Sequence, residues 1–341
     1  MKAALMERGR IWVDEVPDPQ PRAGELLVKS VACGICGSDL HAAKHTEEFV
    51  AASREAGGAF RLTTLNPVVL GHEFCAEVVE YGPDTKGSVP IGSLVCAIPA
   101  LPRRGEFEAV GYSENVPGGF AEYLVLNERL SIAVPAGTPH QFAALTEPMA
   151  VGCHAVNKAR LEGNEAILVI GAGPVGLAVV ASLKQRGAGP VVVTEFAPAR
   201  RALAETMGAD VVIDPREQSP YETRELVRAD ALTIFECVGV PGMIGGIFLD
   251  APRNARIVIV GVCLLEDVSR PLVAVNKELN VQYVLGYSVD EFRETLEMIA
   301  DGTLNVEPII TDTVRLDEVA STFEALGHPD TQGKVLVAPW S

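Results

Sequence analysis

The sequence predicts an α/β protein of two domains, in which a β-rich part precedes a doubly wound parallel sheet. The 341 residues exceed one ordinary domain of about 150 residues, and 48% of them are apolar, which is enough for sizeable cores. Short segments rich in β-branched residues fill the chain to about residue 147. From about residue 165, strands alternate with helices, which is typical of right-handed crossovers in a buried parallel sheet.

Glycine and proline residues mark the expected bounds of the individual helices and strands. In the first part the expected strands are 11–16, 25–31, 75–82, 93–98 and 121–126. In the second part we expect strands at 166–170, 191–195, 211–213, 231–237 and 256–262, alternating with helices at 174–187, 198–207, 221–229 and 241–250. After the apolar stretch 281–287 come helices at 289–301 and 316–326 and a last strand at 333–338. We expect this tail to fold back onto the first domain.

The charge balance excludes some partners. The chain carries 28 Lys and Arg against 45 Asp and Glu, a net charge of −17, which repels nucleic-acid phosphates and anionic lipid headgroups. Seven cysteines, an odd number, do not form a disulfide framework, and the first residues lack the apolar segment of a signal peptide. We therefore expect a cytoplasmic protein with neither nucleic-acid nor membrane partners.

A glycine-rich turn divides the longest uncharged run, residues 166–183. The run has nearly the length of a membrane span, but Gly171, Gly173, Pro174 and Gly176 split it into a short strand and an apolar helix. The first glycine allows a tight turn, the second lets backbone amides approach a pyrophosphate, and the third permits close packing of helix on strand. The helix N-terminus adds partial positive charge, so this turn predicts a dinucleotide site.

Further residues extend the predicted dinucleotide site. Glu195 ends the next strand, where a carboxylate accepts hydrogen bonds from the adenosine ribose and repels a 2′-phosphate, so NAD is favoured over NADP. Arg200, with Arg201 beside it, opposes that preference because it could reach a phosphate, unless both arginines face solvent. The remaining expected cofactor contacts are Val175, Val238, Val260 and Val262.

A second group of residues indicates a metal. Cys33 and Cys36 form a CxxC pair, but a zinc ribbon needs a second pair, and a thioredoxin-like pair belongs near a βαβ unit, not in a β-rich part. A catalytic zinc site needs three protein ligands and an open position. Cys36, with His72 and Glu73 and the isolated acid Glu147, could supply these ligands.

Together these motifs resemble the zinc-dependent medium-chain dehydrogenases, in particular their polyol and 2,3-butanediol dehydrogenase branch. The resemblance covers nearly the whole chain. It rests on VPDPQPRAGELLVKSVACGICGSDLH (16–41), GHE (71–73), GGFAEY (118–123), EPMAVGCHAV (147–156), GAGPVG (171–176), ECVG (236–239) and GKVLV (333–337). It implies a Rossmann domain at 151–286 and a GroES-like, zinc-binding catalytic domain made of 1–150 and 287–341.

The resemblance also assigns roles at the catalytic site. Cys36, His72 and Glu147 would surround one zinc, with Glu73 a ligand or just behind it. Ser38 and His41 occupy the family's proton-relay positions, although Ser38 and Asp39 also fit the N-terminal cap of a helix at 39–45. His45, His140, His154 and His328 have no partner in the sequence. The implied reaction is metal-assisted hydride transfer between an alcohol and NAD, with the proton leaving through Ser38, a ribose hydroxyl and His41.

The chain departs from many relatives in two places. The segment that holds four cysteines and a structural zinc in those relatives contains only Cys96 here, so we expect one zinc per chain. An insertion at 42–70 contains an amphipathic helix, 47–57, and either shapes the substrate pocket or decorates the surface.

Other functions and the quaternary structure stay open at this point. A zinc-free NADPH-dependent enoyl or quinone reductase would keep the glycine turn without the metal residues, a non-catalytic protein would bind NAD without turnover, and a zinc store would need more than one mixed-ligand site. The substrate would be a secondary alcohol, a vicinal diol or a polyol. We expect a homodimer or homotetramer, in which 281–287 could pair edge to edge with a second copy.

Overall fold

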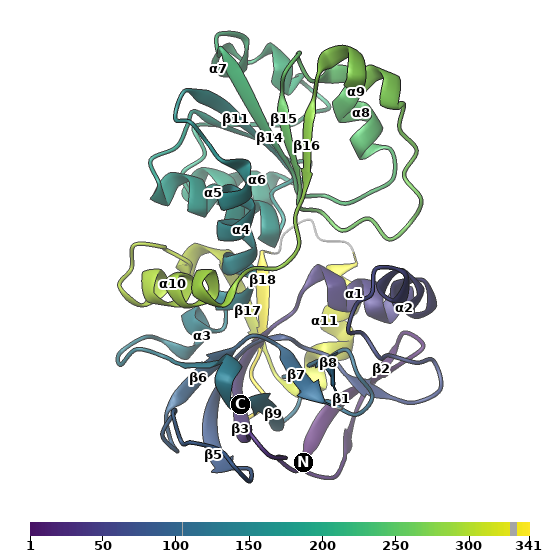
Figure 1. The fold of residues 1–341 in the computed structure, drawn as a ribbon, viewed down its shortest axis with the longest axis vertical. Helices are drawn as coiled ribbons and strands as arrows, with labels where there is room; N and C mark the ends of the chain where they lie inside the picture. Colours follow the sequence, from purple (N-terminus) through teal and green to yellow (C-terminus); the bar gives the residue numbers. More distant parts are fainter. Residues whose placement is uncertain (104, 328–332) are drawn as a thin grey trace.

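Two sheets of different construction lie one above the other in the computed structural model, which describes residues 1–103, 105–327 and 333–341 (Figure 1). The upper sheet is parallel and covered by helices, and the lower body is built mostly from antiparallel strands. The predicted α/β class, with a parallel sheet beside a β-rich part, is therefore confirmed.

The parallel sheet has six strands, all in the same direction. In spatial order they are β13 (Val211–Ile213), β12 (Val191–Thr194), β11 (Glu165–Ile170), β14 (Ala231–Glu236), β15 (Arg256–Ile259) and β16 (Asn280–Tyr283). The order 3-2-1-4-5-6 is that of a doubly wound sheet and places the carboxyl end of β11 at the point where the winding reverses. Ligands bind at this point in such sheets.

Helices cover both faces of the parallel sheet. They are α5 (Pro174–Gln185), α6 (Pro198–Thr206), α7 (Arg224–Val227), α8 (Met243–Asp250) and α9 (Pro271–Lys277). Successive residues of β11 point to opposite faces, so Ile167 and Val169 join one buried cluster while Ala166 and Leu168 join another. Because both faces are buried, the strand is apolar from Ala166 to Ile170 and shows no alternation in the sequence.

The β-rich body contains a seven-stranded sheet, a three-stranded sheet and a hairpin. The large sheet runs β10 (Ser131–Ala133), β6 (Leu94–Ala97), β5 (Glu73–Tyr81), β3 (Glu25–Gly34), β18 (Lys334–Val337) and β17 (Ile310–Val314), with β9 (Tyr123–Asn127) also paired to β3. The small sheet is β2 (Arg10–Glu15), β1 (Lys2–Glu7) and β4 (Val68–Val69), and the hairpin is β7 (Ala100–Arg103) with β8 (Glu106–Ala109).

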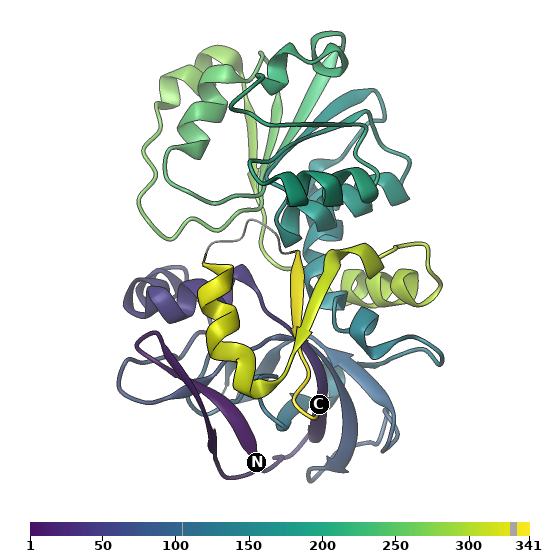
Figure 2. The ribbon, with the colours of Figure 1, turned by 180° about the vertical axis from the view of Figure 1, so that it is seen from behind.

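The end of the chain returns to the β-rich body. β18 pairs with β3 and β17 with β18, so strands from both ends of the sequence share one sheet, as Figure 2 shows from behind. Helix α11 (Val319–Leu326) packs on the same side, and α10 (Val289–Ala300) lies against α4 (Thr146–Ala159) between the two sheets. The predicted division at 150 and 287 stays a prediction.

Several elements differ from the sequence-based expectation. The helix expected at 221–229 is a 3₁₀ turn (Pro220–Glu222) followed by the short α7, and the strands expected to reach 262 and 287 end at Ile259 and Tyr283. β1, β4, the β7–β8 hairpin, α3 (His140–Ala143), α4, α9 and β17 were not predicted. Most of these are too short, or too uniformly apolar, for a clear periodicity.

The segment 42–70 contains the end of α1 (Gly37–Lys44) and the whole of α2 (Thr46–Glu55), and α2 confirms the amphipathic helix expected there. The cap expected at Ser38 is wrong: the helix begins at Gly37, its N-cap is Cys36, and the Asp39 carboxylate accepts a hydrogen bond from the Cys36 amide at 2.9 Å. The uncharged run 166–183 splits into β11 and α5 as predicted, and none of the described helices has the length and apolar character that crossing a bilayer requires.

Candidate functional site

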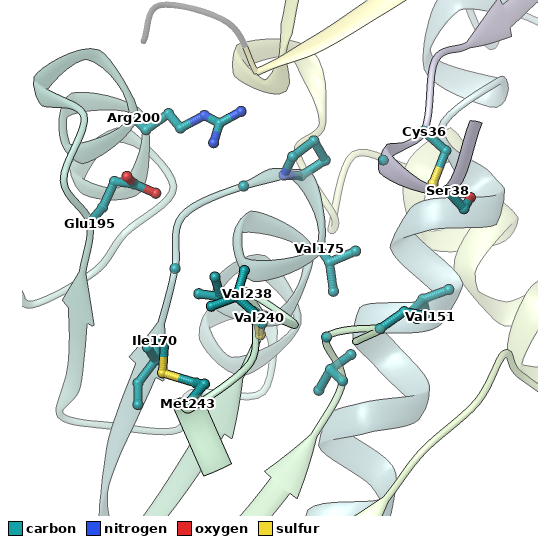
Figure 3. Close-up of a pocket in the computed structure, with 18 of the residues that line it drawn as sticks. Cys36, Ser38, Val151, Ile170, Val175, Glu195, Arg200, Val238, Val240 and Met243 are labelled. Carbon is teal, nitrogen blue, oxygen red and sulfur yellow. The ribbon is translucent and has the colours of Figure 1, made fainter. Parts of the chain in front are cut away.

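A cleft of about 1910 Å³ is lined by residues of both sheets and their connecting segments. Figure 3 shows Glu195 and Arg200 at one end, Cys36 and Ser38 at the other, and a row of valines between them. We call these the nucleotide end and the metal end.

The glycine turn is built without room for side chains. Gly171 has φ of +92°, a conformation that disfavours other residues, and a Cβ on Gly176 would lie 1.9 Å from the Gly171 carbonyl oxygen. Gly173 caps α5, so the free amides of the first turn of this helix point toward the cleft. Gly171, Gly173, Pro174 and Val175 line the cleft, whereas Gly176 serves the packing beneath it.

Glu195 is fixed by backbone amides at the nucleotide end. Its Oε2 accepts a hydrogen bond from the Ala172 amide at 3.0 Å and its Oε1 accepts one from the Ala197 amide at 2.9 Å. The carboxylate is thus held between the glycine turn and the start of α6, with further lone pairs facing the cleft.

The side chains of the two neighbouring arginines have different surroundings. Arg201 turns to the carbonyls of Glu195 and Phe196 and to Asp214, while Arg200 lines the cleft with Nη1 4.0 Å from where a Cβ on Gly173 would lie. A cation therefore stands beside the turn in a strongly acidic protein. The predicted contacts Val238, Val260 and Val262 also line the cleft.

At the metal end, Cys36, His72 and Glu73 come together. Their ligand atoms lie within 4.8 Å of one another. Cys36 precedes α1, and His72 and Glu73 follow Gly71, whose φ of +100° makes the turn into β5. Nδ1 of His72 is buried and has no hydrogen bond to any residue that the structure describes. A thiol, an imidazole and a carboxylate in this arrangement fit the donor set of a catalytic zinc.

Glu73 has a cationic partner. Lys334 Nζ lies 2.7 Å from both carboxylate oxygens of Glu73 and donates to the Ile35 carbonyl at 3.1 Å, and both side chains are buried. Burial lowers the pKa of Lys334, but the charges of Glu73 and its neighbours outweigh that effect and raise it. The charged form of Lys334 is therefore favoured. Lys334 is part of the GKVLV motif, but nothing local in the sequence ties it to Glu73.

Glu147 lies outside the cluster of three but lines the same end of the cleft. Its Oε1 accepts a hydrogen bond of 2.9 Å from the Tyr287 hydroxyl. Burial raises the pKa of Glu147, with the nearby Glu73 adding to that shift, while His72, Tyr287 and Lys334 oppose it. Its predicted role as a zinc ligand stays a prediction.

Asp39 interacts with two residues of the metal end, His72 and Cys36. Its Oδ1 lies 3.4 Å from Nδ1 of His72, too long for a strong hydrogen bond, and its other oxygen accepts from the Cys36 amide. Burial lowers the pKa of His72, but Asp39 and, to a smaller extent, Cys36 together outweigh this effect, so the pKa stands well above its usual value. The net direction follows from the buried, unscreened carboxylate.

The predicted relay residue Ser38 is hydrogen-bonded to a residue that sequence analysis missed. The Tyr112 hydroxyl lies 2.7 Å from Ser38 Oγ and 3.1 Å from Asp39 Oδ1, and its ring centroid is 5.0 Å from that of His72. Because a carboxylate only accepts, the tyrosine donates to Asp39 and can accept from Ser38. His41 lines the cleft as well, and burial, with His45 and Lys44 nearby, lowers its pKa.

Tyr112 follows the β7–β8 hairpin, in the segment where the resemblance led us to expect no structural zinc. This hairpin is held by a buried ion pair: Arg103 Nε and Nη2 donate to the two oxygens of Glu25 at 2.9 and 3.0 Å. A bidentate pair of this kind fixes both position and orientation. The pair therefore anchors the hairpin to β3, the strand that contains Glu25.

The other histidines belong to different surroundings. Nδ1 of His154 lies 2.8 Å from Glu291, which joins α4 to the start of α10. His45 separates α1 from α2, and His140 begins α3. None of these three lines the cleft, and His328 lies outside the described residues.

Comparisons with known proteins agree with this geometry. Residues 22–136 match the alcohol dehydrogenase GroES-like domain, and residues 174–301 match the zinc-binding dehydrogenase family. The chain is 30% identical to (R,R)-butanediol dehydrogenase of Bacillus subtilis (strain 168), covering 99% of this chain and 100% of the relative. It is 29% identical to sorbitol dehydrogenase of the same organism, covering 99% and 97%. The crystal structure of a putative zinc-binding dehydrogenase from Sinorhizobium meliloti 1021 bound to NADP superposes with a TM-score of 0.84 at 27% identity, covering 99% of each chain.

Proposed function

The chain belongs to the zinc-dependent medium-chain dehydrogenase family, and from this premise we propose that it is an alcohol dehydrogenase that transfers hydride between NAD and a secondary alcohol, vicinal diol or polyol. One observation carries the proposal. The cluster of Cys36, His72 and Glu73 and the glycine turn face the same cleft, so an alcohol at one end would meet a nicotinamide reaching in from the other.

Zinc held by Cys36, His72 and a glutamate would polarise the alcohol oxygen and lower its pKa. The residues around it would transfer the proton that the alcohol releases. Ser38 Oγ lies at the metal end and can accept the proton released by the substrate, and His41, on the next turn of α1, can pass it toward solvent. In this proposal Ser38 must turn from Tyr112 toward the cofactor ribose when the relay operates.

The two glutamates differ in their partners, and charge counting indicates how they share the metal. A divalent cation with one thiolate, one neutral imidazole and one carboxylate is neutral, whereas a second carboxylate makes the site anionic and a weaker Lewis acid. Lys334 compensates Glu73, and Tyr287 holds Glu147 by a neutral hydrogen bond. We propose that Glu73 and Glu147 exchange with water at the open position instead of binding tightly together.

NAD is the proposed cofactor because the Glu195 carboxylate stands at the end of β12, where it would bind the ribose hydroxyls and repel a 2′-phosphate. The relative from Sinorhizobium meliloti carries NADP, and Arg200 is the residue of this chain that would favour a phosphate. The free amides at the start of α5, with Arg200, give the pyrophosphate a local positive site in a chain of net charge −17.

We further propose one zinc per chain, because the segment 97–118 contains no cysteine and is held by the Arg103–Glu25 pair. We also propose a homodimer or homotetramer. β16 is an edge strand, and Tyr283 and Leu285, at and just beyond its end, are exposed, so the edge could pair with a second copy.

The test is a pair of substitutions, Cys36→Ser and His72→Ala, with Cys263→Ser as the matched control outside the metal end. We expect the first two to lower alcohol oxidation by at least about 1,000-fold and zinc content to near zero, because each removes a ligand. Binding of NADH, followed by its fluorescence, should change little because the glycine turn is distant in the cleft. Cys263→Ser should keep both activity and metal.

Two outcomes would contradict the proposal. Full activity of the metal-free variants would favour the zinc-free enoyl or quinone reductase, an interpretation that the assembled metal end already disfavours. NADH binding with zinc present but no turnover on any alcohol would favour a non-catalytic NAD-binding protein.

A further inference from the structure

Three aromatic rings extend from the metal end of the cleft. The Tyr112 ring lies 5.0 Å from His72, the Phe60 ring lies 4.6 Å from Tyr112, and Phe49 stacks on Phe60 at 4.9 Å with an angle of 2° between the rings. Phe49 is also 5.5 Å from Tyr112, so the three rings pack as one group. All three residues line the cleft, and we call them the aromatic wall.

The wall is made by the two segments in which this chain departs from many of its relatives. Phe49 lies on α2 and Phe60 follows it, both within the insertion at 42–70, while Tyr112 comes from the segment in which we propose no structural zinc. The Arg103–Glu25 pair holds the hairpin before Tyr112 in place. The insertion therefore shapes the pocket and does not merely decorate the surface.

The surroundings of the wall are apolar. Ala109 and Val110, close to Tyr112 in the sequence, line the same cleft, and so do Pro99, just before β7, and Leu285, after β16. The aromatic wall and these four side chains offer no hydrogen bond except through the Tyr112 hydroxyl. That hydroxyl is already engaged with Ser38 and Asp39.

The two glutamates of the metal end are also engaged with other side chains. Glu73 is paired with Lys334, and Glu147 accepts from Tyr287. A substrate with many hydroxyls would lose its hydrogen bonds to water here and, apart from the reacting hydroxyl, would find few new ones among the described residues. An apolar substituent would instead bury its surface against the three rings.

We propose that the preferred substrate is a secondary alcohol or vicinal diol that carries an aromatic or similarly bulky apolar group, which packs against Phe60 and Tyr112, and that open-chain polyols are poor substrates. This inference rests on the proposed function, because it assumes that an alcohol reacts at the metal end. The proposed substrate preference differs from the one that the name sorbitol dehydrogenase indicates for a relative of this chain.

The experiment compares kcat/KM for 1-phenylethane-1,2-diol, 2,3-butanediol and sorbitol, using the zinc-loaded protein with NAD. We expect the aryl diol to exceed sorbitol by about 100-fold, because buried polar groups without partners discriminate strongly. Phe60→Ala should lower this preference by about tenfold, mainly through KM for the aryl diol, with little change for sorbitol. Phe60→Leu should keep most of the preference because it keeps an apolar side chain.

Phe107→Ala is the matched control, because Phe107 on β8 is 58% exposed and does not line the cleft. It should leave all three rates unchanged, and thermal unfolding should show that the Phe60 variants are folded. A sorbitol rate equal to or above that of the aryl diol would overturn the inference, as would an equal loss with every substrate in folded Phe60→Ala. The proposed function survives either of these results, whereas absence of turnover with all three alcohols overturns the proposed function itself.

Discussion

The two ends of the cleft are held in different ways. At the nucleotide end, the contacts are local and involve the backbone: the glycine turn, the free amides of α5, and Glu195 bonded to two amides. At the metal end, the carboxylates are held by side chains from distant parts of the chain. Glu73 and Lys334 are separated by 261 residues, and Glu147 and Tyr287 by 140.

This difference bears on what a substitution would disturb. A site made of backbone groups depends on conformation, which few side chains can change. A site made of buried pairs depends on each partner, because removing one leaves a charge or a polar atom without compensation in a medium of low dielectric constant. We therefore expect the metal end to respond far more strongly than the nucleotide end to substitutions of residues that touch neither substrate nor cofactor.

The largest effect is expected for Lys334→Met. The substitution leaves the Glu73 carboxylate, which is fully buried, without its cation, and breaking such a pair costs about 3–5 kcal/mol. Urea unfolding of the zinc-free protein should show a loss of this order in the free energy of unfolding. Lys184→Met is the matched control, because the Lys184–Asp210 pair is partly exposed and should contribute less than about 1 kcal/mol.

Equal stability of the two lysine variants would show that the buried Lys334–Glu73 pair contributes no more to folding than the partly exposed Lys184–Asp210 pair. In that case the contrast between the two ends of the cleft would disappear. A loss in Lys334→Met that zinc restores would instead show that the metal can replace the lysine as the partner of Glu73.

Tyr287→Phe tests the second glutamate. The substitution removes the hydrogen bond to Glu147, which is one of the interactions that oppose the effect of burial on the pKa of this carboxyl group. The pKa of Glu147 would therefore rise further above its usual value. The carboxylate would be less available to the metal, and we expect zinc affinity to fall about tenfold, as outer partners of metal ligands typically contribute. Competition with a chelator measures this affinity without relying on turnover.

Tyr221→Phe is the control for this measurement, because Tyr221 lines the cleft at the nucleotide end and should leave zinc affinity unchanged. Unaltered zinc affinity in Tyr287→Phe would mean that Glu147 takes no part in binding the metal. Glu73 would then be the only glutamate of the pair to bind it.

The same contrast explains what the sequence could predict. The glycine turn, Glu195 and the residues Cys36, His72 and Glu73 stand in short motifs whose spacing carries their chemistry, and the structure brings each group to the cleft. The alternation of strands and helices likewise predicts the parallel sheet. These features depend on residues that are close together in the chain.

The partners Lys334, Tyr287, Tyr112 and Arg103 could not be predicted from the residues alone. Each meets its partner through the tertiary fold, and in the sequence a buried lysine or tyrosine looks like any other. Tyr112 is 74 residues from Ser38, and Arg103 is 78 residues from Glu25. The sequence shows a single cysteine, Cys96, in this segment, but only the fold shows that an ion pair holds it and that its tyrosine reaches the metal end.

The smallest effect is expected at the nucleotide end, for Glu195→Gln. The amide keeps one oxygen that can accept from Ala172 or Ala197, so the turn should keep its shape, but it loses the charge that would repel a 2′-phosphate. Hydrogen bonds to a charged group exceed neutral ones by about 1 kcal/mol, so the ratio of kcat/KM for NAD to that for NADP should fall about fivefold. Glu217→Gln, in the lining of the same end, should leave the ratio unchanged. A much larger fall, accompanied by lost stability, would show that the nucleotide end depends on a single side chain as strongly as the metal end does, because the backbone contacts alone would then be unable to hold the turn.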